Sequence, residues 1–131
     1  MTGPITLDGR KFVSFSADSL AADQEIYILG HLRRAGAGEV LRGPDGVKYT
    51  AEQRAEETLT RLFLSGKTHS VLAGCLTEQG KMWNRADADA NAVRFAAITD
   101  VEEKTVMRSL ITRLVIGFCL MDGASSETLR N

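Results

Sequence analysis

The sequence predicts an α+β fold that is mainly α, with an N-terminal β-hairpin packed on a bundle of about five helices. Strand-like alternation of apolar and polar residues is confined to the N-terminal segment, on both sides of Asp8-Gly9. Further along the chain, apolar residues recur every three or four positions between helix-capping residues, of which Thr50 and Asp100 are the clearest. These two patterns together predict the fold class.

Length and composition are those of one globular domain. The chain has 131 residues, of which 44% are hydrophobic and 25% are charged. A chain of this length buries about two thirds of the surface that its unfolded form exposes. We expect a single globular domain over residues 1–123, made of a hairpin at 4–15 and a helical body at 18–123, followed by a frayed C-terminal tail at 124–131.

The charge balance bears on possible partners. The chain has 16 Lys and Arg residues and 17 Asp and Glu residues, interleaved along its length. Nucleic-acid binding relies on clustered cations that neutralise phosphates, and Arg33-Arg34 is the only adjacent arginine pair. We therefore expect no nucleic-acid partner.

The N-terminal segment "ITLDGRKFVSF" has the pattern of two short strands around a tight turn. Asp8-Gly9 supplies the positive φ angles that a type I′ turn requires. Because an isolated hairpin is only marginally stable, its apolar face must lie on the helices that follow.

A first helix is predicted from Ser19 to about Ala35, because its apolar residues fall in one broad helical stripe. Its N-terminus is capped by Ser16, Asp18 or Ser19. The glycine-rich segment from Gly36 to Gly46 is either a long loop or a second small hairpin.

Thr50 and Gln53 have the spacing of a capping box, so a second helix begins there and ends at Gly66. This placement decides how "LSGKT" (64–68), which resembles the end of a phosphate-binding loop, is interpreted. Such a loop needs a strand before it and a glycine five residues before Gly66, where the chain has Arg61 within the predicted helix. We interpret the segment as a helix-to-helix turn in which Thr68 caps the next helix.

The third helix is predicted from about Thr68 to Glu78, where Gly80 stops it. Asp87 is the expected cap of a fourth helix, which continues to about Ile98.

The last helix is predicted to open at the capping box formed by Asp100 and Glu103, to run to about Met121 and to end at Gly123. Its final three turns are apolar around nearly the whole circumference. We therefore expect this end to be the most buried helix or part of an interface.

The sequence shows no convincing catalytic, metal or cofactor site, and we expect none of the three. His31 and His69, the only histidines, lack companions at zinc-ligand spacing. Cys75 and Cys119 lie in apolar runs outside any C-x-x-C pair and are expected to be buried thiols.

Asp87, Asp89 and Asn91 have the spacing of the first ligands of a calcium loop. The loop is incomplete, because Ala92 replaces its glycine and Ile98 replaces its bidentate glutamate. Helix capping and solvated surface explain these residues better than calcium binding.

The candidate residues for contact with a partner are apolar and come from the second half of the chain: Trp83, Leu114, Phe118 and Met121. Trp83, the sole tryptophan, is either a lid on the core or an exposed anchor at an interface. The methionine and the phenylalanine of the last helix suit adaptable contacts with a partner helix.

The sequence also indicates a cytoplasmic location. The start, "MTGPITLDGRK", has no apolar stretch of the kind that a secretory signal requires. The longest apolar run, from Leu110 to Met121, is shorter than the ~20 residues of a membrane span.

In order, these features resemble a known family. The segment from Thr68 to Gly123 contains Trp83, an alanine-rich helix ending in Phe95-Ala96, the cap "TDVEEK" (99–104) and a hydrophobic last helix ending in a glycine. This arrangement resembles the tail assembly chaperones of long-tailed bacteriophages and prophages.

The resemblance implies a non-enzymatic protein of the host bacterial cytoplasm. It would bind the long tape-measure protein and keep its helical surface soluble until tail-tube protein polymerises around it. Two other hypotheses stay open: a small structural or oligomeric subunit of a phage or bacterial assembly, with an interface along residues 114–121, and a small helical regulator.

Overall fold

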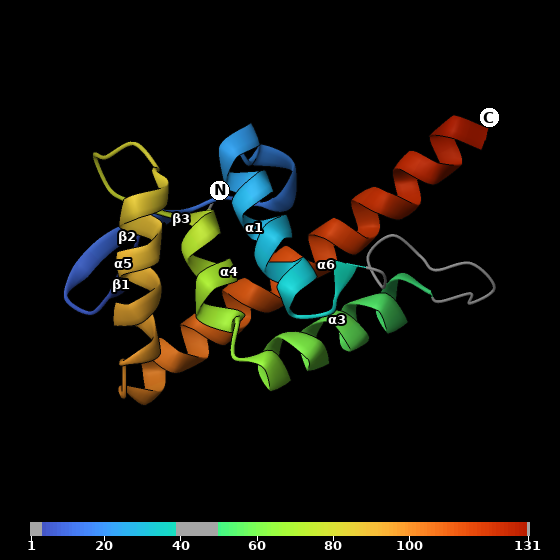
Figure 1. The fold of residues 1–131 in the computed structure, drawn as a ribbon. Coiled ribbons are helices and arrows are strands. Elements are labelled where there is room, and N and C mark those ends of the chain that lie inside the picture. The colour runs from blue at the N-terminus through green and yellow to red at the C-terminus, as the bar shows by residue number, and fades with distance from the viewer. Residues whose placement is uncertain (1–3, 39–49, 131) are drawn as a thin grey trace.

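The computed structural model describes residues 4–38 and 50–130, with side chains as far as Leu120. The described residues form three strands, one short 3-10 helix and five α-helices (Figure 1). These are β1 (Ile5–Leu7), β2 (Arg10–Ser14), η1 (Ala17–Ser19), α1 (Ala22–Arg34), α3 (Ala51–Ser65), α4 (Thr68–Cys75), β3 (Leu76–Glu78), α5 (Arg85–Ala96) and α6 (Val101–Arg130). The predicted α+β, mainly α fold is confirmed.

The strands form one antiparallel sheet in the order β1-β2-β3. Asp8 and Gly9, with φ angles of 53° and 76°, make the tight turn between β1 and β2, as predicted. In the hairpin register, Ile5 lies opposite Phe12. Phe12 is buried, and its ring packs edge-on against that of Phe95 in α5, at 5.2 Å between centroids. The hairpin is thus anchored on the helices.

The prediction of a helix from Thr68 to Glu78 is wrong in its last part. α4 ends at Cys75, and Leu76 adopts an extended conformation with ψ of 137°. Leu76 then pairs with Ser14, and Glu78 pairs with Phe12. This pairing gives β2 a second neighbour and satisfies backbone groups that an exposed strand edge would leave open.

The core is centred on α4, which lies between α1 and α5 (Figure 1). All of its residues from Val71 to Cys75 are buried. Gly74 allows the close approach of α1, since a Cβ atom at this position would lie 2.3 Å from Cγ1 of Ile28.

The start and end of α3 agree with the sequence prediction. The Thr50 hydroxyl accepts a hydrogen bond from the Gln53 N–H at 3.1 Å, and the Gln53 side chain accepts one from the Thr50 N–H at 3.0 Å. Gly66 ends the helix in the left-handed conformation, with φ of 74°. The "LSGKT" segment is therefore a helix-to-helix turn, although the N-cap of α4 is Lys67 and Thr68 is its first residue.

Two other expected caps are replaced by neighbouring residues. α5 begins one turn earlier than expected, and the side chain of Asn84, rather than that of Asp87, accepts the capping hydrogen bond. α1 begins at Ala22, because η1 occupies residues 17–19, where its caps were expected. Most of the segment from Gly36 to Gly46, residues 39–46, lies outside the described residues.

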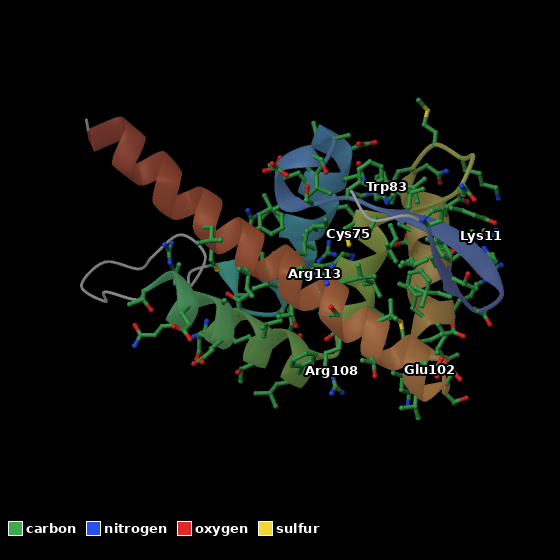
Figure 2. The ribbon with its side chains drawn as sticks, turned by 180° about the vertical axis from the view of Figure 1, so that it is seen from behind. Lys11, Cys75, Trp83, Glu102, Arg108 and Arg113 are labelled. Atoms are coloured by element: carbon green, nitrogen blue, oxygen red, sulfur yellow. The ribbon has the colours of Figure 1, made fainter. Side chains whose placement is uncertain are left out.

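α6 is longer than the sequence predicts, and the expected stop at Gly123 is wrong. A glycine within a helix costs about 1 kcal/mol relative to alanine, and it ends the helix only where the backbone turns left-handed. The residues at 124–130, expected to form a frayed tail, continue the helix. Figure 2 shows α6 crossing one whole face of the body, with Glu102 near its start and Arg113 near its middle.

Candidate functional site

The structure places the predicted contact residues of α6 mainly in the core. Leu114 is 2% exposed and Phe118 is 8% exposed. Neither side chain presents a surface to a partner in this conformation. The side chain of Met121 lies outside the described part of the chain.

Trp83 is half-buried and packs against the core. Its indole N–H donates a hydrogen bond to the carbonyl oxygen of Ala73 in α4 at 3.0 Å. Its ring meets that of Tyr27 in α1 edge-on, at 5.3 Å between centroids. Trp83 therefore ties the connection before α5 to both α1 and α4.

Tyr27 is the centre of this cluster. Its hydroxyl donates to Oδ1 of Asp89 at 2.6 Å, and its ring lies 4.7 Å from that of His31, centroid to centroid. The guanidinium of Arg85 lies 5.6 Å from the Tyr27 ring centroid. Burial, followed by the bond to Asp89, raises the pKa of Tyr27 above its ordinary value. The cluster is thus a packed structural contact with a neutral phenol.

An apolar surface that the sequence analysis missed lies between α3 and α6. Ile116 and Leu120, one helical turn apart on α6, are 42% and 58% exposed. They border a groove of about 370 Å³, called the α3–α6 groove below. Its remaining lining residues are Ala51, Glu52, Ala55, Glu56, Leu59 and Thr112. The all-round apolar character of this end of α6 was the only signal for it in the sequence.

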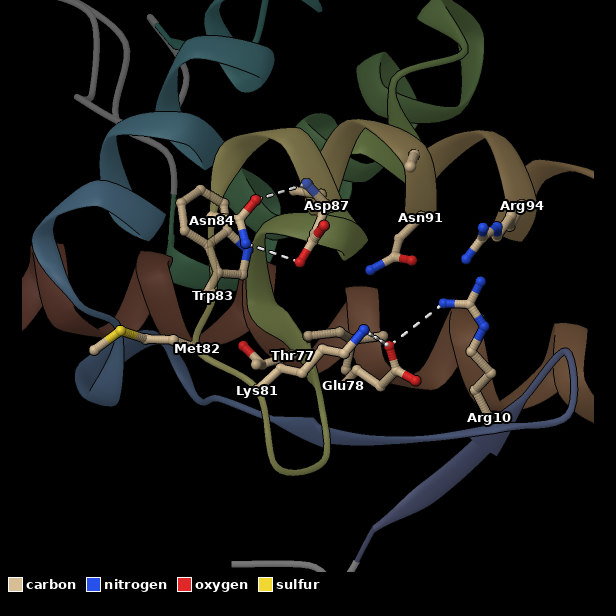
Figure 3. A pocket seen from close by; sticks show the side chains of 13 residues that line it. Arg10, Thr77, Glu78, Lys81, Met82, Trp83, Asn84, Asp87, Asn91 and Arg94 are labelled. Atoms are coloured by element: carbon tan, nitrogen blue, oxygen red, sulfur yellow. Dashed lines mark hydrogen bonds and ion pairs between the residues drawn. The ribbon is translucent and has the colours of Figure 1, made fainter.

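A second concave site is polar and lies between β3, the following turn and α5 (Figure 3). Its volume is about 160 Å³, and it is called the β3–α5 cavity below. On the sheet side, Glu78 forms ion pairs with Arg10 at 3.5 Å and with Lys81 at 3.1 Å. On the helix side, Asp87, Asn91 and Arg94 line the cavity (Figure 3), at the spacing of one helix face.

Two helix-side groups of the cavity are unusual. Asn91 is only 6% exposed, and its side-chain amide, which has no hydrogen-bond partner among the described residues, faces the open space of the cavity. The guanidinium of Arg94 likewise forms no ion pair or hydrogen bond within the described part of the chain, although its backbone carbonyl accepts one from the Ala97 N–H. On the sheet side, the Thr77 hydroxyl also lines the cavity and is buried without a partner in the described residues. A buried polar group without a partner is costly, so it generally has a water molecule or a ligand beside it.

The other candidate groups do not assemble into a reactive site. Burial lowers the pKa of both His31 and His69, and burial raises the pKa of Cys75 to about 12. Among the described residues, no three His, Cys, Asp or Glu side chains gather in a way that would hold a metal ion. Asp89 is bonded to Tyr27, whereas Asp87 faces the cavity, so the two are separated.

No helix of the described region has the length and apolar character to cross a bilayer. A scan against protein-family models and searches of curated proteins and of solved structures found no match to this chain.

Proposed function

We propose that this protein is a non-enzymatic binding protein that holds an apolar helix of a partner in the α3–α6 groove. The observation that carries the proposal is the open apolar surface at Ile116 and Leu120, two large side chains that a folded domain ordinarily covers.

The shape and chemistry of the groove suit a helix. Ala51 and Ala55 are small and lie on the α3 side, so a partner backbone can approach closely. Covering Ile116 and Leu120 removes apolar surface from water, which contributes about 1 kcal/mol for each half-exposed side chain. Glu52 and Glu56 favour a partner whose apolar stripe is flanked by Lys or Arg.

The resemblance of residues 68–123 to tail assembly chaperones supplies the proposed partner. On this proposal, the protein binds the tape-measure protein in the bacterial cytoplasm, keeps its helices soluble and helps to recruit tail-tube subunits. Reversible apolar packing is all that such a role requires, and it uses no catalytic group.

The test is co-expression with a tape-measure protein, followed by copurification and measurement of the soluble fraction of that partner. Ile116→Asp and Leu120→Asp place a charge in the groove at positions that are already partly exposed, so the fold is retained. We expect either variant to lose copurification and to return the partner to the insoluble fraction.

The matched control is Val93→Asp. Val93 lies on α5, away from the groove, and is 72% exposed. The Val93→Asp variant should bind the tape-measure protein as the unchanged protein does. Undiminished capture by both groove variants would contradict the proposed surface. A fixed homo-oligomer that does not bind the tape-measure protein, and that the groove variants dissociate, would instead favour the structural-subunit hypothesis.

A further inference from the structure

We propose that the β3–α5 cavity is a binding site for a small carboxylate, independent of the α3–α6 groove. Three features of the lining support this site: the amide of Asn91, the buried hydroxyl of Thr77 and the cationic side chains.

Asn91 is the first element of the proposed site. It lies on the cavity-facing side of α5, between Asp87 and Arg94, and its amide points into the cavity (Figure 3). Its NH₂ group can donate to an oxygen of a molecule in the cavity, because the amide makes no hydrogen bond with the described residues. The Thr77 hydroxyl on the sheet side also lines the cavity and is buried without a partner in the described part of the chain, which is costly unless a hydrogen-bonding group lies beside it.

The cationic side chains are the second element. The Arg10 guanidinium makes a single polar contact, of 3.5 Å with Glu78, and the Arg94 guanidinium makes none with the described residues, whereas a guanidinium has five N–H donors. Figure 3 shows the two side chains reaching the same end of the cavity from opposite walls, next to Asn91. Their planar forks match the two oxygens of a carboxylate.

The charge of the lining selects a carboxylate over a phosphate. Arg10, Lys81 and Arg94 supply three positive charges, and Glu78 and Asp87 supply two negative charges, so the lining carries one net positive charge. A singly charged carboxylate balances this excess. A phosphate, which carries up to two charges, would leave repulsion from Glu78 and Asp87 uncompensated.

The volume is compatible with a small ligand. A cavity of about 160 Å³ has room for a short acid or for the terminal carboxylate of a peptide. These two sources share the same chemistry and are distinguished by experiment.

Binding can be measured with the protein's own fluorescence, because Trp83 is the only tryptophan and lines the cavity. The probes are acetate, which carries a single charge, a tripeptide with a free C-terminal carboxylate and the same tripeptide with an amidated C-terminus. Acetamide, the neutral analogue of acetate, and inorganic phosphate serve as comparisons. We expect saturable titration by acetate or by the free tripeptide with Kd in the range of about 0.1–10 mM, and weaker titration by each comparison.

The variants are Arg94→Gln and Asn91→Leu, with Arg108→Gln on the exposed side of α6 as the control that removes the same charge elsewhere. Arg94 is exposed, so its replacement leaves the fold intact. Arg94→Gln therefore tests the site even if Asn91→Leu unfolds the protein. We expect Arg94→Gln to raise Kd by about tenfold or more and Arg108→Gln to change it by less than about twofold.

Stronger binding of acetate identifies a free small acid as the source of the carboxylate, and stronger binding of the free tripeptide identifies a peptide terminus. The proposal is overturned if no carboxylate causes a saturable change in Trp83 fluorescence or in ¹H–¹⁵N spectra up to about 20 mM, which means that the cavity holds water only. Equal binding of phosphate, or an equal effect of Arg94→Gln and Arg108→Gln, also overturns it, because either result indicates non-selective attraction of anions.

Discussion

Glu103, in the first turn of α6, accepts a hydrogen bond through Oε1 from the backbone N–H of Asp8 at 2.6 Å. This contact joins the hairpin turn to the start of the last helix. The Glu103 N–H in turn donates to Oδ2 of Asp100 at 2.9 Å, which caps the helix. The predicted capping box is therefore half-formed within the helix, and its glutamate binds a distant turn instead of the N-cap backbone.

Glu103→Ala should lower the free energy of unfolding by about 1 kcal/mol, because it removes a hydrogen bond to a charged acceptor at a partly exposed site. Glu102→Ala is the control, since Glu102 has the same charge in the same helical turn and forms no hydrogen bond or ion pair with the described part of the hairpin. Urea denaturation measures both variants. If both substitutions lower the free energy of unfolding by the same amount, the hydrogen bond to Asp8 adds nothing to the favourable interaction of a negative charge with the helix dipole.

Gly74→Ala should destabilise the protein by about 3 kcal/mol, because a Cβ atom there would overlap Ile28, which is fully buried against α4. Gly30→Ala is the matched control within α1, where an added Cβ meets no atom within 4 Å. It should stabilise the protein by up to about 1 kcal/mol through helix propensity. Thermal unfolding distinguishes the two, and a neutral Gly74→Ala would show that α1 and α4 are not tightly packed.

Stability should fall as the medium becomes mildly acidic. Burial lowers the pKa of His31 and of His69 below the ordinary 6.5 in the folded protein, and the charge of Arg34 adds to the effect at His31. The unfolded chain then binds more protons below pH 6.5, so unfolding becomes easier as the pH falls through this value towards the lowered pKa.

The measurement is urea denaturation between about pH 7.5 and pH 5.5, with the unchanged protein and with His31→Gln and His69→Gln. Each variant should lose part of the pH dependence. If both variants retain the full pH dependence of stability, groups other than His31 and His69 cause it.

The two cysteines should be unreactive in the folded protein. Cys75 and Cys119 are both buried, and burial raises the pKa of Cys75 to about 12, so its reactive thiolate is scarce at neutral pH. We expect labelling by a thiol-specific reagent at about pH 8 to require unfolding, and both thiols to react in urea. Rapid labelling of the native protein would show that a thiol is accessible, and Cys75→Ala would identify which one.

The same raised pKa affects stability at alkaline pH. The unfolded Cys75 thiol ionises near its ordinary pKa of 9.0, while the folded one stays neutral. Stability should therefore decrease as the pH rises above about 9, and Cys75→Ala should reduce that decrease.

The features that the sequence predicted correctly depend on residues that are close together in the chain. The hairpin turn needs only positive φ angles at Asp8 and Gly9. The start of α3 needs only the reciprocal bonds of Thr50 and Gln53, and its end needs only a glycine that turns left-handed. Each of these is a local conformational preference, which composition and spacing express directly.

The features that the sequence did not predict depend on contacts between distant segments. β3 exists because Leu76 and Glu78 pair with β2, and no local signal distinguishes them from the end of a helix. At the C-terminal end of α6, apolar residues surround the helix, so periodicity cannot tell which side is covered. Packing against the rest of the body buries Leu114 and Phe118 and leaves Ile116 and Leu120 exposed.

The sequence by itself therefore determined the fold class, the hairpin and the clearest helix caps, because short-range hydrogen bonds and backbone preferences decide them. Only the tertiary structure decided the third strand, the role of Trp83 and the two candidate sites. Trp83 became a lid through Ala73 and Tyr27, and Asn91 became a buried amide facing a cavity because the sheet lies opposite α5. Burial is a property of how segments far apart in the chain meet, and it decides which side chains remain available to a partner or a ligand.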